Sequence, residues 1–267
     1  MTSDLALALA LADAADAIAL ARFRAADLRI ETKPDLTPVS EADRAVERAI
    51  RERLARERPR EPVLGEEEGG EDGGAGAHWI VDPIDGTKSY VRGIPVWATL
   101  IALERDGEPA VGVVSAPALG RRWWAAHGEG AFADGTRVQV SRVARLEDAV
   151  VSTTSPKAVA AHGLGPAYEA VAARSWAARG FSDFWQHMLL AEGAVDAAVE
   201  PVVALWDVAA IQVIVEEAGG RFTDLRGERT ARGGDCLTSN GLLHDELLAL
   251  LAAPARLQPP VGESESP

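Results

Sequence analysis

The run Trp79-Ile80-Val81-Asp82-Pro83-Ile84-Asp85-Gly86-Thr87 places two carboxylates directly after a short apolar stretch. Trp79–Val81 predicts a buried strand that delivers Asp82 at its end, and Pro83 favours an extended Asp82. The following turn brings Asp82, Asp85 and the Ile84 carbonyl to one side. Because Mg²⁺ prefers such oxygen ligands, the run predicts a metal site, whereas two separate Asp-Pro and Asp-Gly turns are the plainer alternative.

Three further acidic positions stand beside turns or helix starts. Glu66 begins a Glu run in a Gly-rich loop, where acidic residues are usually only solvated. Asp207 in Trp206-Asp207-Val208-Ala209-Ala210 can complement a helix dipole. Asp43 stands three residues after Ser40, a pattern typical of a capping box. Local patterns therefore leave structural roles open at all three positions.

The first half of the chain predicts helices followed by antiparallel strands. The predicted helices are Asp4–Asp27 and Glu41–Arg58, joined by a loop at Thr32–Val39. The predicted strands after Trp79–Val81 are Val96–Leu103, Ala110–Ser115, Arg122–Ala126 and Arg137–Val140. The continuous apolar run Val96–Leu103 suits a strand that is buried on both faces.

Strands and helices alternate in the second half, which predicts an α/β layer. Predicted strands are Ala149–Ser152, Ala194–Val199, Arg221–Asp224 and Leu237–Thr238, and predicted helices are Ala167–Ala173, Phe184–Ala191, Trp206–Ala218 and His244–Leu251. We therefore expect an N-terminal part over 1–145, a C-terminal part over 146–253 and a disordered tail over 254–267.

Composition excludes several classes of protein. The 267 residues include 41 Asp and Glu against 27 Lys and Arg, which gives a net charge of −14. That charge disfavours binding to nucleic acid or to anionic membranes. Cys236 is the single cysteine, so an internal disulfide is impossible. Since the sequence has neither a signal-peptide pattern nor about 18 consecutive apolar residues, a cytoplasmic location is expected.

The order and spacing of the acidic motifs resemble the inositol monophosphatase family. The resemblance rests on Gly65-Glu66-Glu67, the run over 79–87 and Trp206-Asp207-Val208-Ala209-Ala210, with Gly128–Phe132 and Gly219-Gly220 in support. It covers roughly residues 5 to 250. The family implies an α/β fold, the five-layer αβαβα sandwich of the sugar phosphatases, with two to three Mg²⁺ ions and a homodimer.

The resemblance also implies roles for individual residues. Glu66, Asp82 and the Ile84 carbonyl would hold one metal ion, Asp82, Asp85 and Asp207 a second, and Glu66 a third. Thr87, Asp43 and Glu66 would position and activate the attacking water. The backbone N–H groups of Gly86, Thr87 and Lys88 are expected to bind phosphate oxygens, as at a helix N-terminus. Phosphoryl transfer then needs no Ser or Cys nucleophile.

Other segments indicate which phosphate monoester is the substrate. Lys88–Leu103, Arg179–Trp185 and Glu200-Pro201 are similar to the histidinol-phosphatase branch found in high-GC bacteria. Glu200 and Asp183 would bind a cationic group of L-histidinol phosphate, and Tyr90, Trp97 or Trp185 would pack against its imidazole. Asp183 as a helix N-cap and Trp97 as a core residue are the structural alternatives.

Three other functions stay open at this point. Inositol-1-phosphate and a broad range of sugar phosphates are alternative substrates, and a divalent-cation-binding scaffold is the non-enzymatic alternative. Thr87 and Asp43 argue against a scaffold, because metal binding alone needs no water-positioning pair. Bisphosphates are disfavoured, since the expected substrate side offers few cations: Lys88, Arg92, Lys157, Arg174 and Arg179.

Overall fold

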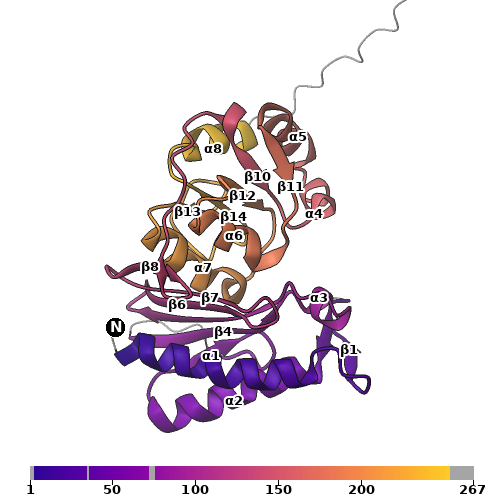
Figure 1. The fold of residues 1–267 in the computed structure, drawn as a ribbon, viewed down its shortest axis with the longest axis vertical. Helices are drawn as coiled ribbons and strands as arrows, with labels where there is room; N and C mark the ends of the chain where they lie inside the picture. The colour runs from indigo at the N-terminus through magenta and orange to yellow at the C-terminus, as the bar shows by residue number, and fades with distance from the viewer. Residues whose placement is uncertain (1–2, 35, 72–75, 253–267) are drawn as a thin grey trace, which may run out of the picture.

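Two β-sheets alternate with three layers of helices in the computed structural model (Figure 1). The structure describes residues 3–34, 36–71 and 76–252, so the predicted tail over 254–267 lies outside the described residues. The layers run α1 and α2, the seven-stranded sheet, α6 and α7, the five-stranded sheet, and finally α4, α5 and α8. The predicted five-layer αβαβα sandwich is therefore confirmed.

The seven-stranded sheet has the order β3-β4-β5-β6-β7-β8-β9, and only its β3–β4 pair is parallel. Its strands are β3 Val63–Gly65, β4 Ala77–Asp85, β5 Ala98–Arg105, β6 Glu108–Ala116, β7 Arg121–Ala126, β8 Gly130–Ala133 and β9 Thr136–Arg137. A separate hairpin pairs β1 Ile30–Thr32 with β2 Pro38–Ser40.

The five-stranded sheet has the order β11-β10-β12-β14-β13, with β10 parallel to β11 and β12. Its strands are β10 Val150–Ser152, β11 Ala177–Arg179, β12 Ala197–Glu200, β13 Arg221–Thr223 and β14 Cys236–Ser239. The helices are α1 Ser3–Arg22, α2 Glu41–Glu57, α3 Thr87–Val91, α4 Pro156–Ala161, α5 Gly165–Arg174, α6 Asp183–Ala191, α7 Leu205–Glu217 and α8 His244–Ala252.

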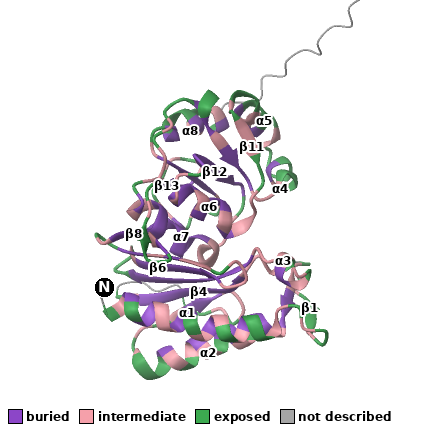
Figure 2. Cartoon of the chain, viewed as in Figure 1, coloured by how far each residue is buried: buried purple, intermediate pink, exposed green. Residues whose placement is uncertain are grey.

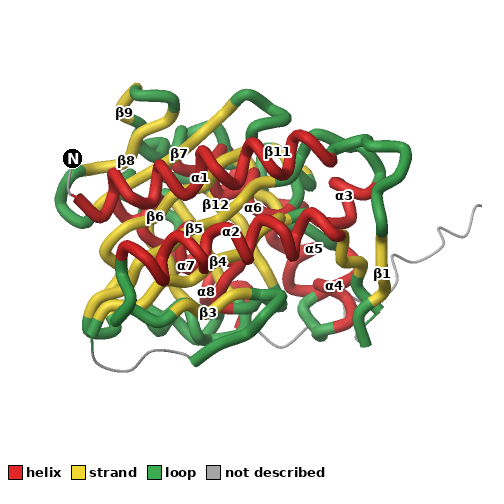
Figure 3. The backbone as a smooth tube through the Cα atoms, turned by 90° about the horizontal axis from the view of Figure 1, so that it is seen from below, coloured by secondary structure: helices red, strands yellow, loops and turns green. Residues whose placement is uncertain are grey.

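Both faces of the central strands are buried, as the apolar run over 96–103 predicts. In β5, Leu100 and Ala102 pack toward α6 and α7, whereas Ile101 and Leu103 pack toward α1 and α2. This alternation follows from the two-residue repeat of a strand. Helices α1 and α2 lie side by side across the outer face of this sheet (Figure 3).

Helix α7 lies between the two sheets, and every residue from Val208 to Val215 is buried (Figure 2). A helix that is apolar all round suits such a place. The helix approaches β6 so closely that a Cβ on Gly112 would lie 2.4 Å from the Ala210 carbonyl oxygen. Glycine at position 112 therefore sets the spacing between this helix and the sheet.

Several sequence predictions were wrong in detail. The segment 32–39 is not all loop, because β2 begins at Pro38. The first helix ends at Arg22 rather than Asp27, and Arg24 has a left-handed backbone with φ +62°. The strand predicted at 137–140 ends at Arg137. Strands β3, β8 and β11 and helix α4 were not predicted, and all four are short.

Within the part of the chain that the structure describes, every helix is too short or too polar to cross a membrane.

Candidate active site

A bulge in β4 brings Asp82 and Asp85 to the same face of the sheet. Asp82 pairs with Leu100 of β5 and Asp85 with Ala98, so three steps along β4 oppose two along β5. In a regular strand, residues three positions apart point to opposite faces. The extra residue of the bulge restores the alternation, so that both aspartates point to one face. Pro83 is tolerated here because a bulge interrupts the ladder. The strand predicted to end at Val81 thus continues to Asp85.

Asp43 joins the start of α2 to this run. Its Oδ2 accepts hydrogen bonds from the Ser40 backbone N–H at 2.9 Å and the Ser40 hydroxyl at 2.6 Å, and the predicted capping box is present. Its Oδ1 lies 3.3 Å from Thr87 Oγ1, which also lies 3.0 Å from the Ile84 carbonyl oxygen. Asp43 is therefore a helix cap with one oxygen directed toward Thr87.

Asp207 comes to the site from the first turn of α7. Its Oδ2 accepts the Ala204 backbone N–H at 2.8 Å, which satisfies a donor that the helix leaves free. The helix-end role considered for Asp207 is thus present as well. Since α7 packs on the face of β4 and β5 to which Asp85 points, Asp207 and Asp85 line one pocket.

A tight turn after β3 carries Glu66, and the side chain of Glu47 in α2 fixes that turn through hydrogen bonds. The fully buried Glu47 carboxylate accepts the backbone N–H groups of Glu67 at 2.8 Å and Glu68 at 3.1 Å. Lys33 Nζ lies 2.7 Å from Glu66 Oε1 and 2.5 Å from Glu67 Oε1. Neither Glu47 nor Lys33 was predicted, because only the turn and the hairpin bring them near Glu66.

Burial and mutual repulsion disfavour the charged forms of the acidic groups. Burial, followed by the charges of Glu66, Asp85 and Asp207, raises the pKa of Asp82 well above its usual range. Burial and the charges of Asp183 and Asp207 do the same for Asp85. Burial raises the pKa of Asp207 to about 7. Perturbed groups of this kind are typical of functional sites.

These residues offer the donor set that Mg²⁺ prefers. Among the described residues, no three His, Cys, Asp or Glu side chains already form a cage that could hold a metal ion, and carboxylates of like charge repel each other. Asp82 Oδ1 is nevertheless buried without a hydrogen-bond partner in this part of the chain. A divalent cation would supply both that partner and the missing positive charge, so the residues fit the metal.

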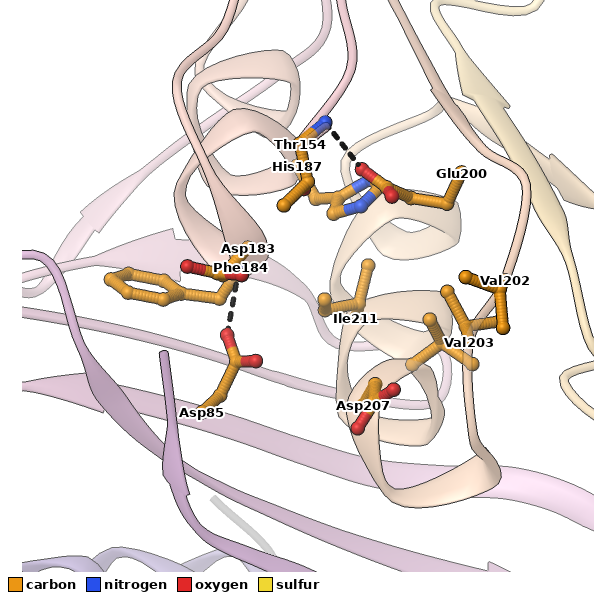
Figure 4. Close-up of a pocket in the computed structure, with 11 residues that line it drawn as sticks. Asp85, Thr154, Asp183, Phe184, His187, Glu200, Val202, Val203, Asp207 and Ile211 are labelled. Carbon is orange, nitrogen blue, oxygen red and sulfur yellow. Dashed lines mark hydrogen bonds between the residues drawn. The ribbon is translucent and has the colours of Figure 1, made fainter. Parts of the chain in front are cut away.

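A second acidic pair lines the same pocket. Asp183 and Glu200 face it together with Asp85 and Asp207, and His187 and Thr154 complete that side (Figure 4). The Phe184 backbone N–H donates to Asp85 Oδ2 at 2.8 Å, which ties the start of α6 to the end of β4. Asp183 forms part of the first turn of α6 and does not act as the N-cap.

The backbone is strained at Asp183 and at the residue before it. Ser182 and Asp183 both have positive φ, at +71° and +41°, which is uncommon for residues other than glycine. Gly86 also has positive φ, at +82°, and a Cβ there would lie 3.3 Å from Asp183 Oδ2. Burial raises the pKa of Asp183, while the charge of Lys88 lowers it. Strain of this kind persists only where surrounding contacts enforce it, as at ligand sites.

The proposed imidazole contacts are corrected in part. Tyr90 and Trp97 are buried in the core against α1, where Trp97 lies 5.3 Å from the Phe23 ring. Trp97 is thus a core residue, and neither ring lines the pocket. Trp185 is half-buried and packs against Phe181 at 5.9 Å.

Of the cations predicted for the substrate side, two make other contacts at the surface and one lies near Asp183. Arg174 forms ion pairs with Glu246 and Glu147 on the surface. The Arg179 guanidinium donates to the neighbouring Ala178 carbonyl. Lys88 is exposed but close enough to influence Asp183. Lys33, which the count of cations omitted, contacts Glu66.

Comparison with known proteins agrees with this geometry. A model of the inositol monophosphatase family matches residues 1–256. A histidinol-phosphatase of Mycobacterium tuberculosis is 56% identical over 94% of this chain and 98% of its own, and one of Streptomyces coelicolor is 51% identical over 93% and 96%. A solved inositol monophosphatase of Thermotoga maritima superposes with a TM-score of 0.85 at 33% identity, covering 94% of this chain and 97% of its own. The chain therefore belongs to the inositol monophosphatase family, and it is a phosphoric monoester hydrolase.

Proposed function

We propose that this chain is a Mg²⁺-dependent phosphatase that hydrolyses L-histidinol phosphate to L-histidinol and phosphate, in histidine biosynthesis. One observation carries the choice of substrate. The pocket that Asp85 and Asp207 line is also lined by two further carboxylates, the buried Glu200 and the half-buried Asp183. Metal binding does not require this second pair, so it is available to the organic part of the substrate.

Histidinol phosphate has the chemistry that such a pair would bind. It carries an ammonium group and an imidazole that takes up a proton near neutral pH. A buried carboxylate is costly unless an opposite charge or hydrogen-bond donors compensate it. Inositol phosphate offers hydroxyl groups only and brings no positive charge to either carboxylate. The histidinol-phosphatase relatives support this choice, since they match nearly the full chain.

Glu66, Asp82, the Ile84 carbonyl, Asp85 and Asp207 would hold two to three Mg²⁺ ions. When bound, these ions supply positive charge that opposes the charge of the phosphate and of the attacking oxygen. The protein side chains would position the attacking water. Asp43 Oδ1 can accept the Thr87 proton, which leaves Thr87 Oγ1 free to accept a hydrogen bond from that water.

The start of α3 is the proposed phosphate-binding element. The first N–H groups of a helix have no partner within it, and they point along its axis toward an anion. Gly86, Thr87 and Lys88 would supply these groups. Gly86 is required here because its left-handed backbone, at φ +82°, lets the chain turn from β4 into α3.

The decisive experiment compares kcat/KM for L-histidinol phosphate with that for inositol-1-phosphate under saturating Mg²⁺. We expect histidinol phosphate to be preferred by more than a hundredfold, because inositol-1-phosphate brings no positive charge to the two carboxylates. A tenfold preference for inositol-1-phosphate would overturn the assignment. Complementation of a histidine auxotroph lacking this phosphatase is an independent check.

A homodimer and a cytoplasmic location complete the proposal. The first is implied by the family, and the second is supported by the single cysteine. Sedimentation of the purified full chain measures the assembly. A monomer at micromolar concentration would contradict the first.

A further inference from the structure

Buried polar side chains behind Glu200 form a continuous hydrogen-bond network. Gln186 of α6 is fully buried, and its carbonyl oxygen accepts the Ser152 hydroxyl at 2.6 Å. Its amide nitrogen donates to Thr154 Oγ1 at 3.0 Å and to Glu200 Oε1. Both polar atoms of the Gln186 side chain are therefore committed to groups that surround Glu200.

This network distinguishes the two oxygens of Glu200. The Thr154 backbone N–H also donates to Oε1, at 2.9 Å, so both donors act on the same oxygen (Figure 4). The Thr154 side chain also hydrogen bonds to this carboxylate, and among the described residues each hydrogen bond whose acceptor oxygen is identified goes to Oε1. Since Glu200 lines the pocket, Oε2 is the oxygen left for a ligand.

Helix α6 couples this network to the other pocket carboxylate. Asp183 and Gln186 are three residues apart and lie on one face of the helix, one turn from each other. The same helix is tied to Asp85 through the Phe184 backbone N–H. Helix α6 therefore carries Asp183 and, through Gln186, also holds Glu200 in position.

A role in packing alone does not account for the arrangement. A buried glutamine needs only neutral partners, and Ser152 and Thr154 already supply them. The third partner is a carboxylate, which a neutral amide donor stabilises in its charged form. The charged form is the one that attracts a cation.

We propose that Gln186 is a positioning residue, which holds Glu200 charged and oriented with Oε2 toward the cationic group of the substrate. This inference rests on the proposed function, because it concerns the organic part of histidinol phosphate. Gln186 touches neither the phosphate nor the water in this scheme. Its loss should therefore appear in KM rather than in kcat.

The test replaces Gln186 by methionine, which keeps the length of the side chain and removes its hydrogen bonds. Gln212→Met is the matched control, because Gln212 is buried on α7 and its amide contacts Glu216 instead, at 3.1 Å. Each protein is assayed with L-histidinol phosphate and with p-nitrophenyl phosphate, which has no cationic group. We expect Gln186→Met to raise KM for histidinol phosphate about tenfold with kcat within twofold, as a lost hydrogen bond to a charged group predicts.

Each outcome decides the inference. A selective rise in KM for histidinol phosphate, absent in Gln212→Met, supports it. Unchanged KM, or equal losses with both substrates, overturns it and leaves the proposed function standing. If the wild type itself fails to prefer histidinol phosphate, the proposed function fails, and this role of Gln186 fails with it.

A milder variant covers the case in which Gln186→Met does not fold. Ser152→Ala removes only the hydroxyl that fixes the Gln186 carbonyl. It should raise KM for histidinol phosphate in the same direction by a smaller factor, about threefold, and leave p-nitrophenyl phosphate hydrolysis within twofold. Suppose that Gln186→Met does not fold and that Ser152→Ala folds with an unchanged KM. Gln186 then serves packing only, and the inference is overturned.

Discussion

Thr87 Oγ1 lies 3.3 Å from Asp43 Oδ1, although the two residues are 44 positions apart in the chain. The other Asp43 oxygen is fully used in capping α2. One carboxylate therefore serves the helix with one oxygen and the proposed water-positioning pair with the other. These two roles can be separated by mutation.

Asp43→Asn should abolish most activity while preserving the helix cap. The asparagine oxygen can still accept the Ser40 N–H, but the amide cannot take the Thr87 proton. We expect kcat to fall about 10²- to 10⁴-fold, with the melting temperature nearly unchanged. Asp43→Ala should show the same loss of activity together with a loss of about 1 kcal/mol in the free energy of unfolding. Wild-type turnover in Asp43→Asn would refute the role assigned to Asp43.

Asp85→Asn should remove Mg²⁺-dependent activity and leave the fold intact. Its amide oxygen can still accept the Phe184 N–H, whereas a neutral side chain binds Mg²⁺ weakly. We expect kcat/KM to fall by about 10²- to 10³-fold or more. The thermal stabilisation produced by Mg²⁺ should weaken in parallel. Unimpaired turnover would remove Asp85 from the metal site.

Glu47→Gln should weaken metal binding without touching a proposed ligand. The amide keeps one acceptor oxygen and places its NH₂ group against either the Glu67 or the Glu68 N–H group, so the turn that carries Glu66 shifts. Changes in such supporting contacts typically lower metal affinity at least tenfold, so the Mg²⁺ concentration for half-maximal activity should rise by about that factor. Exposed Glu52 of the same helix supplies the control, Glu52→Gln, which should match the wild type.

Acidification should weaken substrate binding through Glu200. Burial raises the pKa of this carboxyl to about 7, so it takes up a proton as the pH falls through 7 and loses the charge that attracts a cation. KM for histidinol phosphate should therefore rise about tenfold between pH 8 and pH 6.

Glu200→Gln is the control for this pH dependence. It should show a high KM whose remaining slope comes from groups other than Glu200. Identical slopes in the two proteins would show that Glu200 does not titrate in the binding step.

The acidic cluster was predictable because its proposed metal ligands lie in three short contiguous runs, 65–67, 79–87 and 206–210. The residues that support it were not, since each reaches the site through tertiary structure. Lys33 depends on the β1–β2 hairpin, which the prolines of that segment had suggested was a loop. Gln186 lies in an apolar helix with nothing local to mark its partner. Tyr90 follows the proposed phosphate-binding turn closely, yet the short α3 directs its ring into the core, where its hydroxyl donates to the Ala19 carbonyl at 2.8 Å.

The alternating patterns predicted an α/β layer, and the resemblance to the family implied the five-layer fold. The errors in the individual elements fall where segments are short. A strand of three residues, such as β3 or β11, has too few positions to display a two-residue repeat. Pro83 misled in another way. The sequence predicted a turn after Asp82, but a bulge lets β4 continue through Pro83, and only the pairing with β5 reveals that bulge.

The missing side chain of Gly112 has a wider consequence than close packing. Ala210, whose carbonyl fills that space, is one helical turn beyond Asp207 on α7. A single methyl group at position 112 would push α7 away from the sheet and carry Asp207 away from Asp82 and Asp85. The distance between the two sheets therefore sets the position of Asp207 in the proposed site. A substitution at Gly112, which has no functional group of its own, should lower activity as strongly as the loss of a proposed metal ligand.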